Sequence, residues 1–343
     1  MRREIGEIPA TLERIIGSRP EIEDVAAAIA GFGPRWVTIA ARGTSDHAAV
    51  YAQYLIETLL GIPTGLAKPS VTTLYDARLD WRGGLLLAIS QSGRSPDIVA
   101  VTTGARQGGA LTIAITNDDD TPLAAAADHV LRCQAGRELA VPATKTYVAE
   151  LAVVAALVGA LRPETGLTGE LEEMPNALRA VEAATDRWLE TGEAQLEALA
   201  VADRALVVSR GYNLATALEL ALKLKETCGL FASPYSTADF AHGPLILAGP
   251  GVPALGIRPD GQVGELVDRA LEVIEERGGR AIRIGASEAR RWEDALILPV
   301  ELPEPLTPLA FAVAGQLLVE AVARRRGLDP DAPPGLNKVT LTR

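Results

Sequence analysis

Apolar residues along the chain alternate between short continuous runs and longer stretches in which they recur three and four positions apart. The short runs are typical of buried strands, and the longer stretches are typical of helices packed on one side. Strands are predicted at Trp36–Ala40, Leu85–Ile89, Leu111–Ile115 and His129–Cys133, and helices at Ala48–Leu60, Asp97–Gln107 and Lys145–Leu161. Because strands and helices alternate in this order, the pattern predicts an α/β fold with a parallel sheet flanked by helices.

The pattern breaks once and then starts again. The break is predicted at Arg162–Pro175, and an amphipathic helix follows near Asn176–Ala198 before a second α/β series begins at Ala205–Val208. The segments Arg42–Gly61 (RGTSDHAAVYAQYLIETLLG) and Arg210–Gly229 (RGYNLATALELALKLKETCG) both begin with Arg-Gly and end with Gly at the same spacing. This agreement favours a duplicated unit, although any two strand–turn–helix segments could show it by chance.

Composition narrows the class of protein. A length of 343 residues suggests two domains. The net charge of −11 argues against a nucleic-acid-binding surface, which would need clustered Lys and Arg. The first residues lack the apolar core of a signal peptide, and Leu151–Leu161 is too short to cross a bilayer. Cys133 and Cys228 are too few for a disulfide framework or a zinc site, so we expect a cytoplasmic protein without membrane contact.

Polar loops follow two of the predicted strands. The loop 90–95 (SQSGRS) leads into a helix through Ser95-Pro96-Asp97, a pattern of N-cap, first-turn proline and acidic residue. Open α/β sheets bind ligands at the carboxyl ends of their strands, and helix N-termini bind anions, so this loop suits a phosphate monoester. Gly43-Thr44-Ser45 ends the first strand in the same way. The alternative is an ordinary capped helix after a polar turn.

Charged residues interrupt an otherwise apolar helix near Ala215–Gly229. Glu219, Lys223 and Glu226 share one face of this helix. Such a stripe is usually a solvated face, but a helix that is apolar on its other sides tends to be buried, and its charges could then line a cleft and transfer protons.

Histidine is scarce, with only His47, His129 and His242 in the chain. His129 falls in a predicted strand, and a structural role is expected for it. His242 precedes Gly-Pro and is either a turn residue or a general acid/base. No spacing typical of a metal site is present, so no metal or organic cofactor is expected.

Taken together, these segments resemble the sugar isomerase (SIS) domain family, and in particular the isomerase half of the glutamine–fructose-6-phosphate aminotransferases, over nearly the whole chain. The motifs that carry the resemblance are Gly43-Thr44-Ser45-Asp46-His47-Ala48, Ser90-Gln91-Ser92-Gly93, Glu138 to Lys145 (ELAVPATK), Ala217-Leu218-Glu219 with Lys223-Leu224-Lys225-Glu226, His242-Gly243-Pro244-Leu245 and Asn337-Lys338.

The resemblance implies two flavodoxin-like SIS units and a set of site residues. A sugar 6-phosphate would be held by the side chains of Ser45, Ser90, Gln91, Ser92 and Ser95, and Thr44 and the Val141 backbone would contact the sugar. Glu226, assisted by Lys223, would move a proton between C1 and C2, His242 would assist ring opening, and Lys338 would form an imine with the keto sugar. The resemblance also implies a homodimer in which His242 reaches the neighbouring subunit's site.

Two departures from the aminotransferase pattern direct the functional expectation. Arg94 and Ser95 replace the acid and Thr of the SQSGET pattern, a change that keeps the hydroxyl and bears on substrate preference. Arg2 follows Met1 where the synthase has its glutaminase nucleophile, so we expect no release of ammonia from glutamine and a reaction that runs toward ammonia release. We therefore expect a deaminase/isomerase that converts glucosamine 6-phosphate to fructose 6-phosphate and ammonia. A fructosamine-6-phosphate deglycase, another amino-sugar phosphate isomerase and a non-catalytic sugar-phosphate sensor are the alternatives. The expected domains are residues 1–162, a helical linker 163–198, residues 199–326 and a C-terminal tail 327–343 over the active site.

Overall fold

The computed structural model describes residues 1–338, which form two compact α/β units. The first unit contains Ile8–Glu138, Lys145–Pro175 and the described residues after Leu336. The second unit contains Met1–Glu7, Leu139–Thr144 and Asn176–Leu336. Each unit therefore includes segments that are distant in the sequence, whereas the domains expected from the sequence follow one another along the chain.

The first unit is built on a five-stranded parallel sheet in the order β2-β1-β3-β4-β5. Its strands are β1 (Trp36–Ala40), β2 (Thr64–Leu66), β3 (Gly84–Ile89), β4 (Leu111–Thr116) and β5 (His129–Arg132). All six residues of the central strand β3 are buried, as expected for a strand covered on both faces. The order 2-1-3-4-5 is the flavodoxin-like one and places a switch point between β1 and β3.

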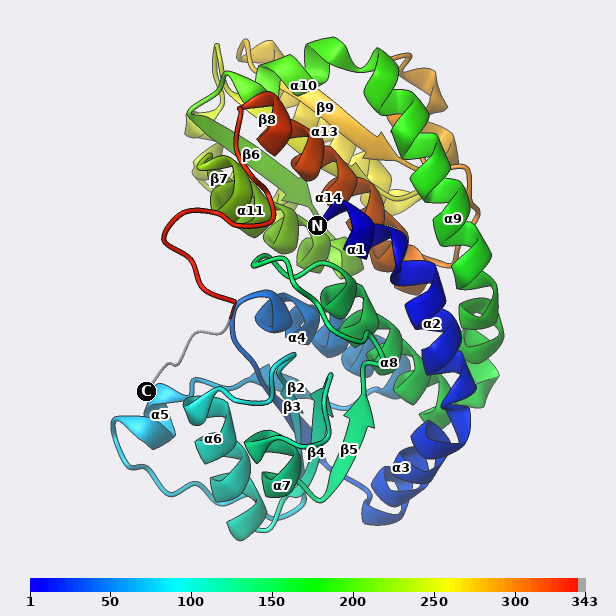
Figure 1. Cartoon of the computed structure of the whole chain (residues 1–343), viewed down its shortest axis with the longest axis vertical. Helices are drawn as coiled ribbons and strands as arrows, with labels where there is room; N and C mark the ends of the chain where they lie inside the picture. The colour runs from blue at the N-terminus through cyan, green and yellow to red at the C-terminus, as the bar shows by residue number, and fades with distance from the viewer. Residues whose placement is uncertain (339–343) are drawn as a thin grey trace. The chain divides into compact units, whose positions relative to one another are not determined.

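Helices cover both faces of this sheet (Figure 1). One face carries α6 (Pro96–Gln107) and α7 (Pro122–Ala126), and Ile98, Val101 and Ala105 of α6 pack on Leu86 and Ala88 of β3. The helices of the other face are α3 (Arg19–Phe32), α4 (Thr44–Leu55) and α8 (Lys145–Leu161), with α2 (Ile8–Gly17) packed on α8. A π-helical turn, Ile56–Leu60, continues α4, and the short helix α5 (Ser70–Thr73) lies beside α6.

The second unit repeats the topology, because its parallel strand order β10-β9-β8-β6-β7 is again 2-1-3-4-5 when counted along the chain. The strands are β6 (Arg204–Ser209), β7 (Phe231–Ser236), β8 (Pro253–Arg258), β9 (Arg280–Gly285) and β10 (Leu296–Ile297). Helices α12 (Thr237–Ala241) and α13 (Gln262–Glu276) lie on one side, and α10 (Glu193–Ala200), α11 (Leu214–Cys228) and α14 (Thr307–Arg325) on the other. The short helix α1 (Arg2–Gly6) packs on α14. The fold class predicted from the sequence is confirmed.

The predicted break at Arg162–Pro175 is largely wrong. Only the turn Pro163–Thr165 separates α8 from α9. Helix α9 (Leu167–Thr191) is 25 residues long and contains Pro175 in its interior. Leu171 and Met174, which precede Pro175, and Leu178, which follows it, are all buried. The apolar side of α9 is therefore packed both before and after the proline. This packing outweighs the backbone hydrogen bond that a proline removes from a helix.

Among residues 1–338, one helical stretch, Glu304–Arg325, is long and apolar enough to span a membrane. Its apolar window is 94% buried inside the protein. The hydropathy of this stretch is therefore accounted for by α14, which packs on α10 and α11.

Candidate functional site

Two loops at the carboxyl edge of the first sheet supply most of the predicted phosphate ligands. The segment that connects β1 to α4, here called the β1 connection, ends at Gly43, which has a left-handed φ of 55°. Thr44 then begins α4. Ser45 lies in the first turn of α4, where its hydroxyl is buried and donates to the Glu150 carboxylate of α8 at 2.8 Å. The β1 connection therefore holds these residues at the helix N-terminus, the end that attracts anions.

The second loop connects β3 to α6 and has a fixed turn. The Gly93 N–H donates to the Ser90 carbonyl at 3.1 Å, and Gly93 adopts a left-handed φ of 59°. Ser90 is buried, whereas Gln91, Ser92 and Ser95 are partly exposed. Ser95 is the N-cap of α6, but its hydroxyl does not form the usual capping bond within the helix. Its hydroxyl is thus available to a ligand, and so is the N–H of Asp97, whereas Pro96 has no N–H and the Ile98 N–H is bonded to the Asp97 carboxylate.

An ion pair joins these two loops. Arg42 follows β1, and its Nε lies 2.7 Å from the carboxylate of Asp97 in the first turn of α6. The Asp97 side chain is fully buried, and it also accepts the N–H of Ile98 at 2.9 Å. Because Asp97 is buried and paired, it holds the β1 and β3 connections together on either side of the switch point.

An open hollow of about 530 Å³ adjoins the β3 loop, within the usual range for small-molecule sites. Lys338 enters it, with its Nζ 2.5 Å from the Glu138 carboxylate. Glu138 is buried and also accepts hydrogen bonds from the Thr146 N–H and hydroxyl at 3.2 and 2.8 Å. The hollow is lined by Gln91, Ser92, Arg94, Asn117, Asp118, Gly136, Arg137, Glu138 and Lys338.

In the second unit the charged stripe of α11 is buried rather than solvated. Lys223 lies 2.5 Å from a Glu226 oxygen and 3.4 Å from a Glu219 oxygen, and the side chains of Lys223 and Glu219 are at most 1% exposed. Burial alone would lower the pKa of Lys223, but the two carboxylates outweigh it and raise that pKa. Glu226 is 24% exposed and is the member of this cluster that a substrate can reach.

The remaining predicted residues of the second unit are His242 and Val141. His242 follows α12 and is exposed, and within residues 1–338 its imidazole makes no hydrogen bond or ion pair. The Val141 N–H donates to the Asp331 carbonyl at 2.9 Å, so its backbone has only the carbonyl left for a ligand.

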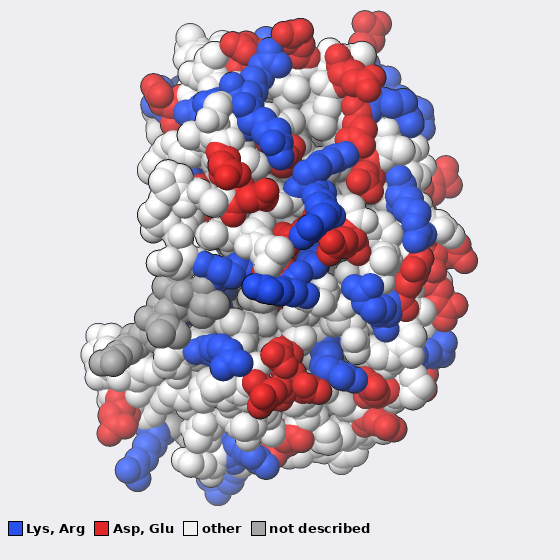
Figure 2. Space-filling view, in the orientation of Figure 1, with Lys and Arg blue, Asp and Glu red and all other residues white. Residues whose placement is uncertain are grey.

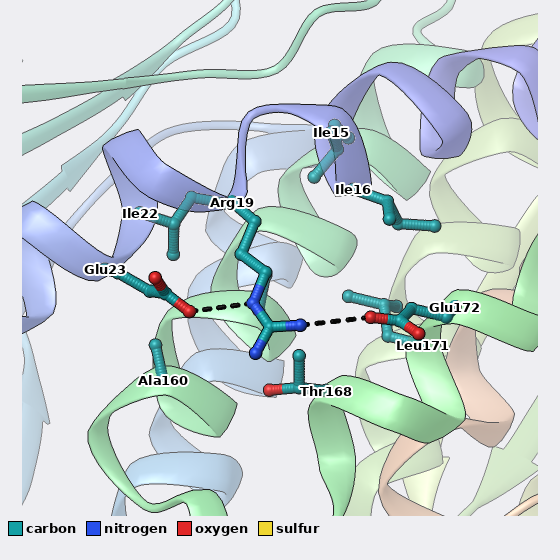
Figure 3. A pocket seen from close by; sticks show the side chains of 10 residues that line it. Ile15, Ile16, Arg19, Ile22, Glu23, Ala160, Thr168, Leu171 and Glu172 are labelled. Carbon is teal, nitrogen blue, oxygen red and sulfur yellow. Dashed lines mark hydrogen bonds and ion pairs between the residues drawn. The ribbon is translucent and has the colours of Figure 1, made fainter.

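A separate apolar pocket in the first unit is not a candidate for the sugar. It lies among α2, α3, α8 and the start of α9 and has a volume of about 30 Å³ (Figure 3). Its one arginine, Arg19, already bonds Glu23 at 2.7 Å and Glu172 at 3.2 Å. The pocket is smaller than ligand sites usually are, and its cation is paired.

Several residues of the first unit's site were not singled out from the sequence. They are Arg42, Asp97, Asn117, Arg137, Glu138 and Thr146, of which Asp97 and Glu138 had been noted only as parts of motifs. Asp97 and Glu138 could have been noticed as acidic residues beside a loop. Their partners, Arg42 and Lys338, are 55 and 200 positions away in the sequence, so the pairs themselves could not be predicted from local patterns. Within residues 1–338, no group of His, Cys, Asp and Glu could hold a metal ion.

Comparison with known proteins places these features in a family. The SIS domain model matches residues 34–160 and 198–300. The chain is 36% identical to the glutamine–fructose-6-phosphate aminotransferase [isomerizing] of Methanothermobacter thermautotrophicus over 98% of its own length and 56% of the relative. The Thermococcus kodakarensis aminotransferase is 34% identical, with 98% and 57% covered. The chain therefore spans about half the length of these curated relatives.

Solved structures agree with this. A provisionally assigned phosphosugar isomerase of Silicibacter pomeroyi superposes with a TM-score of 0.86 at 37% identity, covering 96% of this chain and 99% of that one. The glucosamine-6-phosphate deaminase of Thermotoga maritima has the same fold, with a TM-score of 0.74 at 22% identity and 97% and 99% covered. With two matched segments, a repeated 2-1-3-4-5 sheet and polar loops at the sheet edge, the chain belongs to the SIS domain family.

Proposed function

We propose that this chain is an amino-sugar phosphate deaminase/isomerase that converts glucosamine 6-phosphate and water to fructose 6-phosphate and ammonia. The observation that carries the proposal is the hollow of the first unit, where the hydroxyl loop after β3 and the amine of Lys338 open on the same space. A phosphate site beside a primary amine suits a phosphorylated carbonyl substrate, because the amine can form an imine with the carbonyl.

The phosphate would be bound by Ser90, Gln91, Ser92 and Ser95 together with the N-terminus of α6, and by Ser45 across the switch point, while Thr44 would contact the sugar. Hydrogen bonds to a charged group contribute about 1.5–3 kcal/mol each. Removal of the phosphate from the ligand should therefore weaken binding by two orders of magnitude or more. The Val141 carbonyl would contact the sugar.

The chemistry would use the α11 cluster. In the open-chain aldose, the Glu226 carboxylate removes the proton from C2 and returns it to C1, so that the C2 amine becomes an imine. Lys338 attacks C2 and displaces ammonia, and water then hydrolyses the Lys338 imine to release fructose 6-phosphate. Lys223, held between Glu219 and Glu226, would fix the position of the Glu226 carboxylate for the first step. His242 would transfer the proton during ring opening, and no metal or organic cofactor takes part in this scheme.

The setting of the enzyme is part of the proposal. We infer a cytoplasmic homodimer with shared active sites that contacts neither nucleic acid nor membrane. Support for the absence of nucleic acid comes from the net charge of −11 and from the face drawn in Figure 2, where positive and negative side chains are interspersed.

The proposal is tested with a panel of substrates. We expect ammonia and fructose 6-phosphate from glucosamine 6-phosphate, and no product from glucosamine. Borohydride reduction in the presence of fructose 6-phosphate should add the sugar phosphate to Lys338, detected by peptide mass spectrometry. N-acetylglucosamine 6-phosphate, galactosamine 6-phosphate and fructoselysine 6-phosphate complete the panel. Turnover of fructoselysine 6-phosphate alone would favour the deglycase, and tight binding of sugar phosphates without any turnover would favour a sensor.

A further inference from the structure

The second unit has a hollow of its own between α12 and α13. Its volume is about 320 Å³, at the lower end of the range for small-molecule sites. Arg210 lines it from the carboxyl end of β6, where an open α/β sheet binds ligands. The lining is apolar apart from Arg210, Thr237 and Arg269. Of the described residues, none that is assigned to the sugar phosphate lines this hollow.

One wall of the hollow contains a buried hydroxyl group. Thr237 is the first residue of α12 and is only 8% exposed, and within residues 1–338 its Oγ1 has no hydrogen-bond partner. The capping of α12 is done by Ser236, whose hydroxyl accepts the Asp239 N–H at 3.1 Å. Because buried polar groups are nearly always hydrogen-bonded, an unpaired hydroxyl in the wall of a hollow indicates a position for a polar ligand atom.

Arg210 is the counterpart of Arg42 in the repeated topology, but its surroundings differ. Both arginines follow the first strand of their sheets, and Arg42 is paired with Asp97, the second residue of α6. The second residue of α13 is Val263, whose Cγ2 lies 3.6 Å from the point where a Cβ on Gly211 would be. Within residues 1–338, the Arg210 guanidinium has no hydrogen bond or ion pair. With valine in the place of the acid, this guanidinium is free to bind an anion.

The charges at the hollow also favour an anion. Arg269 is 72% exposed and lies 4.0 Å from Glu265, a surface pair of a kind that contributes little to stability. Asp239 and Glu304 lie on neighbouring segments, but neither pairs with Arg210 or lines the hollow. Within residues 1–338, the lining therefore has two guanidinium groups and no acidic residue.

We propose that this hollow binds a small organic anion. Its carboxylate or phosphate is bound by Arg210, Arg269 and the Thr237 hydroxyl, and its apolar body packs on Phe240 and Leu266. Guanidinium groups match both oxyanions through parallel hydrogen bonds. A bare inorganic ion would leave the apolar lining uncovered, so an apolar body should add to the affinity. This site is independent of the proposed reaction, since its residues are different and its binding is measured without turnover.

The test compares ligands of similar shape and different charge. Phenylacetate carries a carboxylate, and phenylacetamide carries a neutral amide on the same body. NMR titration in the presence of saturating fructose 6-phosphate gives a Kd for each, and we expect phenylacetate to bind at least tenfold more tightly. Phenyl phosphate should likewise bind more tightly than inorganic phosphate, and its Kd relative to phenylacetate identifies the preferred oxyanion. Arg210→Gln should reduce the preference for acid over amide several-fold, and addition of Arg269→Gln should bring the two Kd values close together.

Thr237→Val separates a role in binding from a role in stability. Because the hydroxyl has no partner within residues 1–338, its removal should leave the free energy of unfolding of the free protein unchanged or raise it. The same variant should bind phenylacetate several-fold more weakly. Arg204→Gln is the matched control, because Arg204 is an exposed arginine at the opposite end of the same strand, β6. It should keep the wild-type preference for the acid.

Equal binding of phenylacetate and phenylacetamide by the wild-type protein would contradict the proposal. So would a wild-type preference in the variant that lacks both arginines, or a wild-type affinity for phenylacetate in Thr237→Val. None of these results would bear on the deaminase reaction, which is measured by ammonia release. A protein without deaminase activity that still prefers the acid through Arg210 would contradict the proposed function and support this site.

Discussion

Lys223 lies between two carboxylates on one face of α11, one buried and one partly open to solvent. This asymmetry predicts different effects for the three residues. Glu226→Gln removes the proposed base but leaves Lys223 paired with Glu219, so we expect the fold to persist and kcat to fall by about 10²–10⁴-fold. The loss of proton transfer should also abolish exchange of the C1 proton of fructose 6-phosphate with deuterated water, measured by NMR.

Glu272→Gln provides the same chemical change at an exposed position of α13 and should leave both rates unchanged. Exchange at the wild-type rate in Glu226→Gln would rule out this residue as the base.

Lys223 itself is predicted to matter for stability as well. Lys223→Met would leave Glu219 buried without its cation, and removal of one member of a buried pair costs about 3–5 kcal/mol. Because the folded state raises the pKa of Lys223 above its ordinary value of 10.5, its stabilising charge is complete below that pH and is lost as the pH rises through the folded-state pKa. Chemical denaturation should therefore show that the free energy of unfolding of Lys223→Met is much lower than that of the wild-type protein at pH 7. The difference between the two proteins should be smaller at strongly alkaline pH.

The sequence was sufficient to predict that Glu219, Lys223 and Glu226 share one face of α11, because this follows from helical spacing alone. It left open whether this face is solvated, since burial depends on the packing of α14 and β6 against the helix. The partners Glu138 and Lys338 are 200 positions apart, and local patterns contain no information on such a pair.

At the scale of elements, the turn at Gly93 shapes the proposed phosphate loop. An alanine there would keep a strained φ of 59° and place its Cβ 2.4 Å from the Thr121 hydroxyl. We expect Gly93→Ala to displace the β3 loop and raise the KM for the sugar phosphate at least tenfold. Gly33→Ala, at a φ of 62° with no atom within 4 Å of the new Cβ, is the control for strain alone. It should cost about 1–2 kcal/mol of stability without a change in KM.

A wild-type KM in Gly93→Ala would show that the turn does not position the phosphate ligands.

The long central strands were predictable to within a residue, because continuous apolar runs are unambiguous when both sheet faces are covered. The edge strands β2 and β10, with three and two residues, were not predicted, since so short a run has no periodicity. The continuation of α9 through Pro175 was missed because the local penalty of a proline was given more weight than the packing of Leu171 and Leu178.

At the scale of the whole molecule, the repeated strand order shows that the similarity of Arg42–Gly61 and Arg210–Gly229 is part of a larger correspondence. Both segments follow the first strand of a 2-1-3-4-5 sheet and form its first crossover helix. The proposed roles nevertheless differ, because the first helix contributes Thr44 and Ser45 at its N-terminus and the second contributes Glu226 near its C-terminus. A sequence repeat therefore predicted the architecture but could not predict the division of functions.

The proposed dimer makes a prediction about complementation between chains. If His242 acts in the neighbouring subunit's site, as the family resemblance implies, Glu226 and His242 of one site come from different chains. The exposure of His242, and the absence of any side-chain partner for it within residues 1–338, support this assignment. Glu226→Gln and His242→Ala homodimers should each be poorly active with the cyclic sugar. In a mixed dimer, one site carries both substitutions and the other site carries neither.

Co-expression of the two variants with different affinity tags allows the mixed dimer to be isolated and its composition to be verified by native mass spectrometry. Random pairing makes half of the dimers mixed, and each mixed dimer has one intact site, so the unfractionated mixture should recover roughly a quarter of wild-type activity. The purified mixed dimer should recover about half. His242→Ala alone should regain activity when the substrate is supplied as an open-chain analogue, since ring opening is then unnecessary, whereas Glu226→Gln should not. A mixed dimer as inactive as its parents would show that each chain completes its own site.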